Sequence, residues 1–168
     1  MDSNGDTTAL ETDEAYVSFV AERREQILSR LADACARAGR DSSEVTLAAV
    51  SKTVGPSEAL AAMRAGYATF AENRPQELVR KLDAFAAAGI EAPRFDMIGN
   101  LQKNKINQVL GRASLIQSIS SEGLAQAVSK RAEREGLCVP VLLECNVSGE
   151  QSKGGFAPDE VRAAADAL

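Results

Sequence analysis

Short apolar runs alternate along the chain with longer segments that place apolar residues on one side of a helix. Between Asp13 and Ala38, apolar residues recur at three- and four-residue spacing, acidic residues open the segment and Gly39 follows it, which predicts a helix. The short apolar runs predict strands at 44–50, 67–71, 94–98, 114–119 and 139–147. Further helices are predicted from Pro56 to Gly66, from Pro75 to Gly89, through Leu110, from Ser120 or Ser121 to Gly136, and after Pro158.

About five strand–helix pairs in strict alternation predict an α/β fold. Such alternation implies a parallel sheet with right-handed crossovers, either doubly wound or belonging to a barrel. Parallel strands place their carboxyl ends on one rim, so the polar residues that follow the strands are expected to share a site there. These residues are Lys52, Glu72-Asn73, Gly99-Asn100, Ser120-Ser121 and Asn146-Ser148.

Lys52 is the most informative of these residues. It ends the apolar run 46–50 after Ser51, and Pro56 then opens a helix, so it is expected at the carboxyl end of a buried strand. Partial burial there would disfavour the charged ammonium, and a neutral amine condenses with an aldehyde to form a Schiff base. A lysine whose stem packs while its head stays in water explains this stretch at least equally well.

Composition and charge narrow the range of functions. The 168 residues carry a net charge of −5, which argues against nucleic acid or an anionic membrane as the main partner. No apolar run is long enough to cross a membrane, and the polar, acidic start differs from a secretory signal, so a cytoplasmic location is expected. Residues 1–12 are expected to form a disordered lead, and residues 13–168 a single domain.

The titratable residues exclude several kinds of site. The chain has no histidine, and Cys35, Cys138 and Cys145 form no Cys-x-x-Cys pair, so neither a metal site nor a disulfide framework is expected. Nucleophile pairs that depend on histidine are excluded as well. The sequence also lacks the glycine-rich phosphate-binding patterns of nucleotide-binding folds. Lysine, carboxylates, tyrosine and cysteine remain for chemistry, and no catalytic residue is assigned.

Four motifs taken together resemble a known family. In order and with fitting spacing, they resemble the signatures of the YggS/PROSC pyridoxal phosphate homeostasis proteins. The resemblance covers the chain from about residue 13 to its end. The motifs are Leu47-Ala48-Ala49-Val50-Ser51-Lys52-Thr53, Ala71-Glu72-Asn73-Arg74-Pro75-Gln76-Glu77, Ile98-Gly99-Asn100-Leu101-Gln102-Lys103-Asn104-Lys105 and Asn146-Val147-Ser148-Gly149-Glu150-Gln151-Ser152-Lys153-Gly154-Gly155-Phe156.

The resemblance implies a TIM (β/α)8 barrel similar to the amino-terminal domain of alanine racemase. Pyridoxal 5'-phosphate (PLP) would be held as a Schiff base on Lys52, with Asn73 beside it. The family is regarded as a carrier and regulator of PLP and vitamin B6, without a firmly established catalytic reaction. This chain departs from the usual family pattern, because Ala71 stands in place of a glycine, Asp96 in place of a histidine, and Gln117 within a run that usually begins with histidine.

Length is the larger departure from the family. A closed eight-stranded barrel takes about 250 residues, so the 168 residues are expected to hold only about the first five βα units of a truncated member. The family's phosphate-binding residues lie in the final strands. An open set of five strands would expose unpaired edges, so self-association is possible, although the sequence leaves the oligomeric state undetermined.

Two other interpretations of function stay open. One is a racemase-like PLP enzyme acting on amino acids, which needs a second acid–base group on the other side of the cofactor. Tyr16 and Tyr67 are the only tyrosines, and neither is predicted at a strand end, which argues against this enzyme. The other is a remnant that no longer binds PLP.

Overall fold

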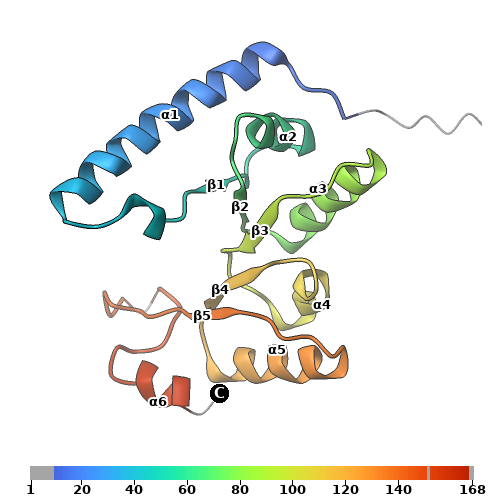
Figure 1. Ribbon diagram of the computed structural model, residues 1–168. Coiled ribbons are helices and arrows are strands. Elements are labelled where there is room, and N and C mark those ends of the chain that lie inside the picture. The colour runs from blue at the N-terminus through green and yellow to red at the C-terminus, as the bar shows by residue number, and fades with distance from the viewer. Residues whose placement is uncertain (1–9, 151, 167–168) are drawn as a thin grey trace, which may run out of the picture. The chain divides into compact units, whose positions relative to one another are not determined.

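The computed structural model describes residues 10–150 and 152–166, and it shows the predicted alternation of strands and helices (Figure 1). The strands are β1 (Ala48–Val50), β2 (Thr69–Glu72), β3 (Arg94–Met97), β4 (Leu115–Ile119) and β5 (Val141–Leu143). The α-helices are α1 (Glu14–Arg37), α2 (Pro56–Arg64), α3 (Pro75–Ala87), α4 (Ile106–Val109), α5 (Glu122–Arg134) and α6 (Val161–Asp166). Two short 3-10 helices are η1 (Ser42–Glu44) and η2 (Lys103–Lys105).

The strands form a five-stranded sheet whose order, β1-β2-β3-β4-β5, follows the sequence. β3 and β4 pair in parallel, with Asp96 opposite Leu115, and β4 and β5 also pair in parallel, with Ile116 opposite Val141. This order, with a helix between successive strands, is that of the first strands of a (β/α)8 barrel. The predicted α/β class and parallel sheet are therefore confirmed.

The described residues divide into two compact units. The first holds the residues up to Phe70 together with Arg80–Pro93, and the second holds Ala71–Val79 together with the residues from Arg94 onward. The division passes through β2 and α3, so each of these elements contributes residues to both units.

In the first unit, the long helix α1 packs against α2. The carboxylate of Asp13 accepts a hydrogen bond from the backbone N–H of Ala15, which caps α1 at the predicted start. Within α1, the guanidinium of Arg24 lies 5.8 Å from the centre of the ring of Tyr67, which follows α2. This cation–π contact joins α1 to the segment that enters β2.

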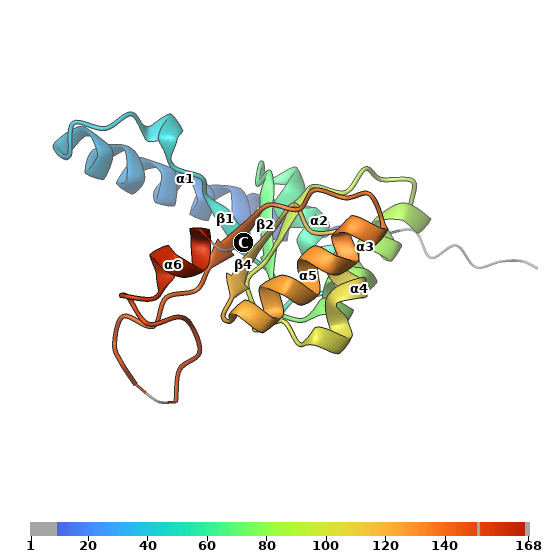
Figure 2. The same ribbon diagram turned by 90° about the horizontal axis from the view of Figure 1, so that it is seen from below.

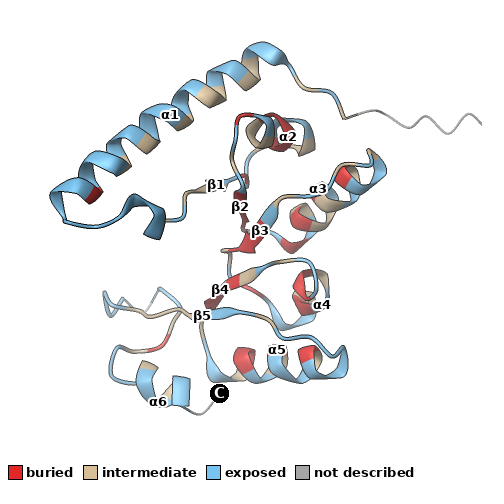
Figure 3. Cartoon of the chain, in the orientation of Figure 1, coloured by how far each residue is buried: buried red, intermediate tan, exposed pale blue. Residues whose placement is uncertain are grey.

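In the second unit, α4 and α5 contribute buried residues to a core that also contains residues of β3 and β4. Figures 1 and 2 show α4 and α5 beside each other, and Figure 3 shows the buried residues that each of them carries. The fully buried members include Met97, Ile106, Val109, Ile116 and Ile119. Met97, Ile116 and Ile119 thus join β3 and β4 to the core that Ile106 and Val109 of α4 share with α5.

Two predicted strands are shorter than the sequence pattern indicated. The first was expected at 44–50, but Asp41 accepts a hydrogen bond at 2.8 Å from the Ser43 N–H and starts η1, so β1 begins only at Ala48. The fifth was expected at 139–147, but the strand covers Val141–Leu143. Beyond it, the Glu144 carbonyl accepts from the N–H of Phe156, so the backbone there pairs with a later segment instead.

Two expectations from the sequence concern the first residues of the chain and membrane-spanning segments. Most of the expected disordered lead, 1–12, lies outside the described residues, and its state stays a prediction. Across the part of the chain that the structure describes, no helix has the length and apolar character needed to cross a membrane.

Candidate functional site

Lys52 lies where the sequence placed it, directly after β1. The strand ends at Val50, and the N–H of Val54 donates to the carbonyl oxygen of Ser51 at 3.2 Å, which closes a tight turn around Lys52. Helix α2 follows at once, with the N–H of Gly55 donating to the carboxylate of Glu58 at 2.9 Å. The side chain of Lys52 is exposed, so the expected partial burial is not found.

Lys81 is a second lysine of this region, which the sequence analysis did not single out. It is fully buried on α3, and its Nζ donates a hydrogen bond to the carbonyl oxygen of Ser51 at 3.0 Å. A signal for it was present in the sequence, because Lys81 lies three residues after Leu78 and four before Phe85, which are both fully buried. A lysine at that spacing shares the buried face of its helix.

Asn73 follows β2 in the second unit. Its backbone N–H donates to the carboxylate of Glu72 at 2.8 Å, while its own Oδ1 is buried and has no hydrogen-bond partner among the described residues. A buried acceptor without a donor costs free energy, so its place in a native structure calls for a partner such as water or a ligand. Among the described residues of the second unit, the buried Oε1 of Gln108 is unpartnered in the same way, so Asn73 is one of two such acceptors there.

Gly99, which follows β3, makes room for the backbone of Asn73. A Cβ atom at position 99 would lie 2.7 Å from the Cα of Asn73 and closer still to its carbonyl oxygen, so a side chain cannot be accommodated without movement. The carbonyl of Gly99 is held by a hydrogen bond from the hydroxyl of Ser118. The glycine of this motif is thus explained by packing between the ends of β2 and β3.

A hollow of about 290 Å³ adjoins Asn73. Among the described residues, it is bordered by two cationic side chains, by amides and by a proline, and by no carboxylate. The lining residues are Asn73, Arg74, Pro75, Gln76, Asn100, Gln102 and Lys105. The absence of a negative charge in this lining means that an anionic ligand would not be repelled there.

Asp96, which replaces a histidine of the family pattern, is buried, and both oxygens of its carboxylate accept hydrogen bonds. Its carboxylate accepts hydrogen bonds from Arg94 Nε at 2.9 Å, from Arg94 Nη2 at 3.3 Å and from Gln117 Nε2 at 3.0 Å. The hydrogen bond to Asp96, and then its negative charge, raise the pKa of Arg94 above the ordinary value. The two departures at Asp96 and Gln117 thus form one hydrogen-bonded cluster, an adjacency that the sequence analysis did not predict.

The loop after β5 is organised by Asn146. Its Oδ1 accepts hydrogen bonds at 3.1 Å from the hydroxyl of Ser148 and from the N–H of Gly149. Its Nδ2 donates to the carbonyl oxygen of Glu150 at 3.0 Å. The asparagine and serine of this motif are therefore explained by the shape of the loop itself.

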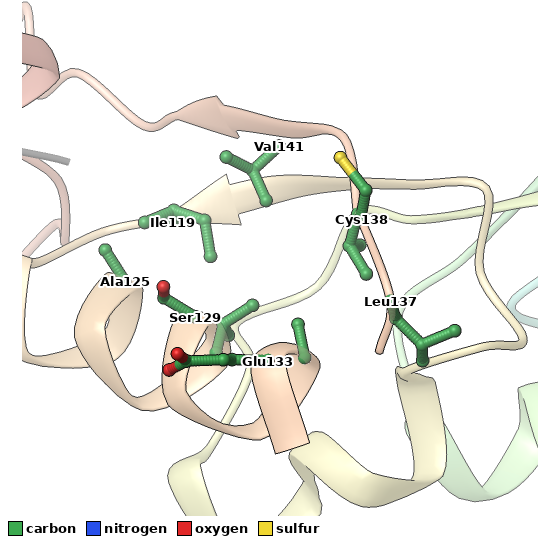
Figure 4. Close-up of a pocket in the computed structure, with 10 residues that line it drawn as sticks. Ile119, Ala125, Ser129, Glu133, Leu137, Cys138 and Val141 are labelled. Carbon is green, nitrogen blue, oxygen red and sulfur yellow. The ribbon is translucent and has the colours of Figure 1, made fainter. Parts of the chain in front are cut away.

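A larger hollow of about 510 Å³ lies between α5 and strands β4 and β5, but it is mainly apolar (Figure 4). Ile119 and Val141 line it from the strands, Ala125 and Ser129 line it from α5, and Cys138 borders it. No lysine or arginine is among its lining residues. It therefore lacks the amine that the predicted chemistry needs, and the candidate site remains at the strand ends.

Lys52 and Asn73 follow neighbouring strands of the sheet, as expected, but they belong to different units. Lys52 lies in the first and Asn73 in the second. That both contact one ligand stays a prediction.

Comparisons with known proteins agree with this architecture. Residues 25–168 match the family described as "Alanine racemase, N-terminal domain". A pyridoxal phosphate homeostasis protein of Aquifex aeolicus is 36% identical over 141 residues, which cover 84% of this chain and 60% of the relative. A protein of the same name from Escherichia coli strain K12 is 33% identical over 137 residues, covering 82% of this chain and 58% of the relative.

Solved structures show the same fold. A protein of Bifidobacterium adolescentis, described as unknown, is 38% identical with a TM-score of 0.83, and the match covers 91% of this chain and 65% of that one. The structure of PipY from Synechococcus elongatus with PLP bound is 28% identical with a TM-score of 0.70, covering 89% of this chain and 63% of that one. This chain thus spans about 60% of the length of the relatives it matches. Its matched residues, its parallel sheet and its similarity to the pyridoxal phosphate homeostasis proteins lead to one conclusion: the chain belongs to the alanine racemase N-terminal domain family.

Proposed function

We propose that this chain binds PLP through Lys52 and takes part in PLP homeostasis. The observation that carries the proposal is the exposed primary amine of Lys52, held in a tight turn directly after the first strand of a fold that a PLP-bound relative shares. When bound, PLP supplies an aldehyde, whose carbon forms a C=N bond with an amine nitrogen as one water molecule leaves.

The residues present fit this ligand. Lys52 is exposed, so its Nζ is open to a small molecule from solution. The Oδ1 of Asn73 has acceptor capacity left for a ligand that carries a donor, and the described residues that line the hollow beside it include no carboxylate that would repel a phosphate. Lys52 is the point of attachment in this proposal, and Asn73 orients the ligand.

The proposal is that of a carrier, with no reaction assigned. A racemase-like enzyme needs an acid–base group facing Lys52 across the cofactor. Tyr16 stacks on Phe19 within α1, with ring centres 6.5 Å apart, and Tyr67 lies against Arg24. Both tyrosines are thus engaged with α1, which supports the carrier over the racemase.

The proposal includes a cytoplasmic location. Cys35, Cys138 and Cys145 are all free thiols, and Cys138 is exposed. Free and exposed thiols are typical of proteins in reducing compartments.

Borohydride reduction of the protein with PLP, followed by peptide mass mapping, tests the proposal. Reduction makes the bond between amine and cofactor permanent, so the modified lysine can be identified. We expect one adduct on Lys52, its loss in Lys52→Ala, and no change in Lys103→Ala, which removes an exposed lysine. Adducts scattered over several lysines, or none at all, would mean that this chain does not hold the cofactor at a defined site.

A further inference from the structure

Lys81 is a buried cation that the proposed function does not use. Its side chain is fully buried on α3, between the buried residues Leu78 and Phe85 of the same helix face. Taking an ammonium out of water is unfavourable unless the charge finds partners. A leucine or methionine would fill the same space without that cost, so the ammonium is kept for the contacts it makes, and one of these is the hydrogen bond to Ser51.

The hydrogen bond from Lys81 ends at the peptide group that leads into Lys52. Its Nζ lies 3.0 Å from the carbonyl oxygen of Ser51, and both residues belong to the first unit. That carbonyl carbon is bonded to the backbone nitrogen of Lys52, so the atoms of this planar peptide unit move together. Fixing the oxygen therefore fixes the plane from which the Cα of Lys52 leaves.

The same oxygen accepts a second hydrogen bond. The N–H of Val54 donates to it at 3.2 Å, across the turn that contains Lys52. The carbonyl is thus held from the helix side by a charged donor and from the turn by a backbone donor. A charge-assisted hydrogen bond in a buried setting is stronger than a neutral one, so Lys81 is expected to contribute the larger part of this restraint.

We propose that Lys81 is a positioning residue for Lys52, holding the Ser51–Lys52 peptide and with it the Cα from which the side chain of Lys52 extends. This inference rests on the proposed function of Lys52 as the point of attachment for PLP. Lys81 is buried and does not itself bind the cofactor. Its contribution is orientation, for which displacements of about 1 Å change rates by about 100-fold.

The test compares Lys81→Met with the wild-type protein. Methionine keeps most of the length of the side chain and removes the donor. We expect the maximal rate of adduct formation at Lys52 to fall about 10- to 100-fold, while the PLP concentration for half-maximal rate changes by less than about threefold, since Lys81 does not contact the ligand. Phe85→Leu is the matched control, because it loosens the same buried face of α3 and keeps the ammonium.

Hydrogen exchange gives a second readout that does not depend on PLP. If Lys81 holds the Ser51 carbonyl, exchange of the Val54 amide should accelerate by at least about tenfold in Lys81→Met, and much less in Phe85→Leu at equal global stability. Unchanged attachment at Lys52 together with unchanged exchange at Val54 would overturn the positioning role. If the wild-type protein forms no adduct on Lys52, the proposed function fails, and the exchange experiment still tests the hold of Lys81 on the turn.

If Lys81→Met does not fold, the hydrogen bond of Lys81 can be tested in the wild-type protein. An NMR correlation between the ¹⁵Nζ of Lys81 and the ¹³C carbonyl of Ser51 reports this hydrogen bond directly. Its detection would support the role of Lys81. A Lys81 Nζ whose protons exchange freely with water, with no such correlation, would contradict it.

Discussion

At the scale of single residues, the site is shaped by close approaches that only certain side chains permit. Gly99 lies against the backbone of Asn73, and Lys81 donates to the carbonyl of Ser51. In both cases a residue far along the chain fixes the backbone at a strand end. The proposed ligand-binding residues, Lys52 and Asn73, are therefore expected to depend on neighbours that never contact the ligand.

Gly99→Ala should show this dependence. The added methyl group would meet the Asn73 backbone at less than contact distance, so we expect a loss of about 1–3 kcal/mol in the free energy of unfolding and a displaced Asn73. Urea denaturation measures the first effect, and the NMR shifts of the Asn73 side-chain amide report the second.

Gly123→Ala is the matched control for this substitution. Gly123 lies in helix α5, and its new methyl group would meet only the flexible end of the Lys103 side chain, 3.0 Å away. Because alanine is favoured over glycine in a helix, we expect no loss of stability, and a gain of up to about 1 kcal/mol. Equal losses in the two variants would contradict the close approach at Gly99.

At the scale of elements, helix boundaries were predicted better than strand boundaries. Pro56, Pro75 and the capping serine before α5 act through local geometry, and these helices begin within one residue of the expected positions. Strand ends depend on hydrogen bonds to other segments. At Glu144, for example, the N–H donates to Ile119 of β4, whereas the carbonyl oxygen accepts from the N–H of Phe156. Such pairing is a long-range property that a periodic pattern does not contain.

The site shows the same division between local and long-range information. The positions of Lys52 and Asn73 after their strands followed from local pattern. The contact between Asp96 and Gln117 and the hydrogen bond from Lys81 to Ser51 bring together residues 21 and 30 positions apart, which the pattern could not pair. Lys81 could still have been found, because its spacing from Leu78 placed it on the buried side of α3.

Ser121→Ala tests the cap of α5. The hydroxyl of Ser121 accepts a hydrogen bond from the N–H of Leu124 at 3.3 Å, and without it one donor at the start of the helix loses its partner. We expect the free energy of unfolding to fall by about 1 kcal/mol. Ser121→Asp should retain most of the stability, since a carboxylate also caps a helix and favours its amino-terminal end. If alanine and aspartate behave alike in thermal denaturation, the cap contributes nothing.

At the scale of the whole molecule, the edge of the sheet at β5 is the exposed feature with the clearest consequence. β5 is the last strand in the sheet order, and Val141 and Leu142 on it are exposed apolar residues. Strand edges of this kind pair with other chains unless they are covered or charged. Self-association through β5 therefore remains the prediction for this chain in isolation.

Leu142→Glu should weaken that association. Leu142 is 51% exposed, so a carboxylate there costs little in the folded chain and repels its copy in a paired edge. We expect light scattering at rising protein concentration to show a lower mean mass than for the wild type. Phe19→Glu is the control, because Phe19 is similarly exposed, at 52%, but belongs to helix α1 and not to a strand. A wild-type protein that stays monomeric at all concentrations would refute the prediction.

The sheet order has a consequence for how the protein is made. Each strand pairs with the strand that precedes it in the sequence, so no strand waits for a partner that is synthesised much later. A chain leaving the ribosome grows at about 5–20 residues per second. Each new strand and helix can therefore add to a surface that is already in place, and the turn that carries Lys52 is completed once α3 has emerged with Lys81.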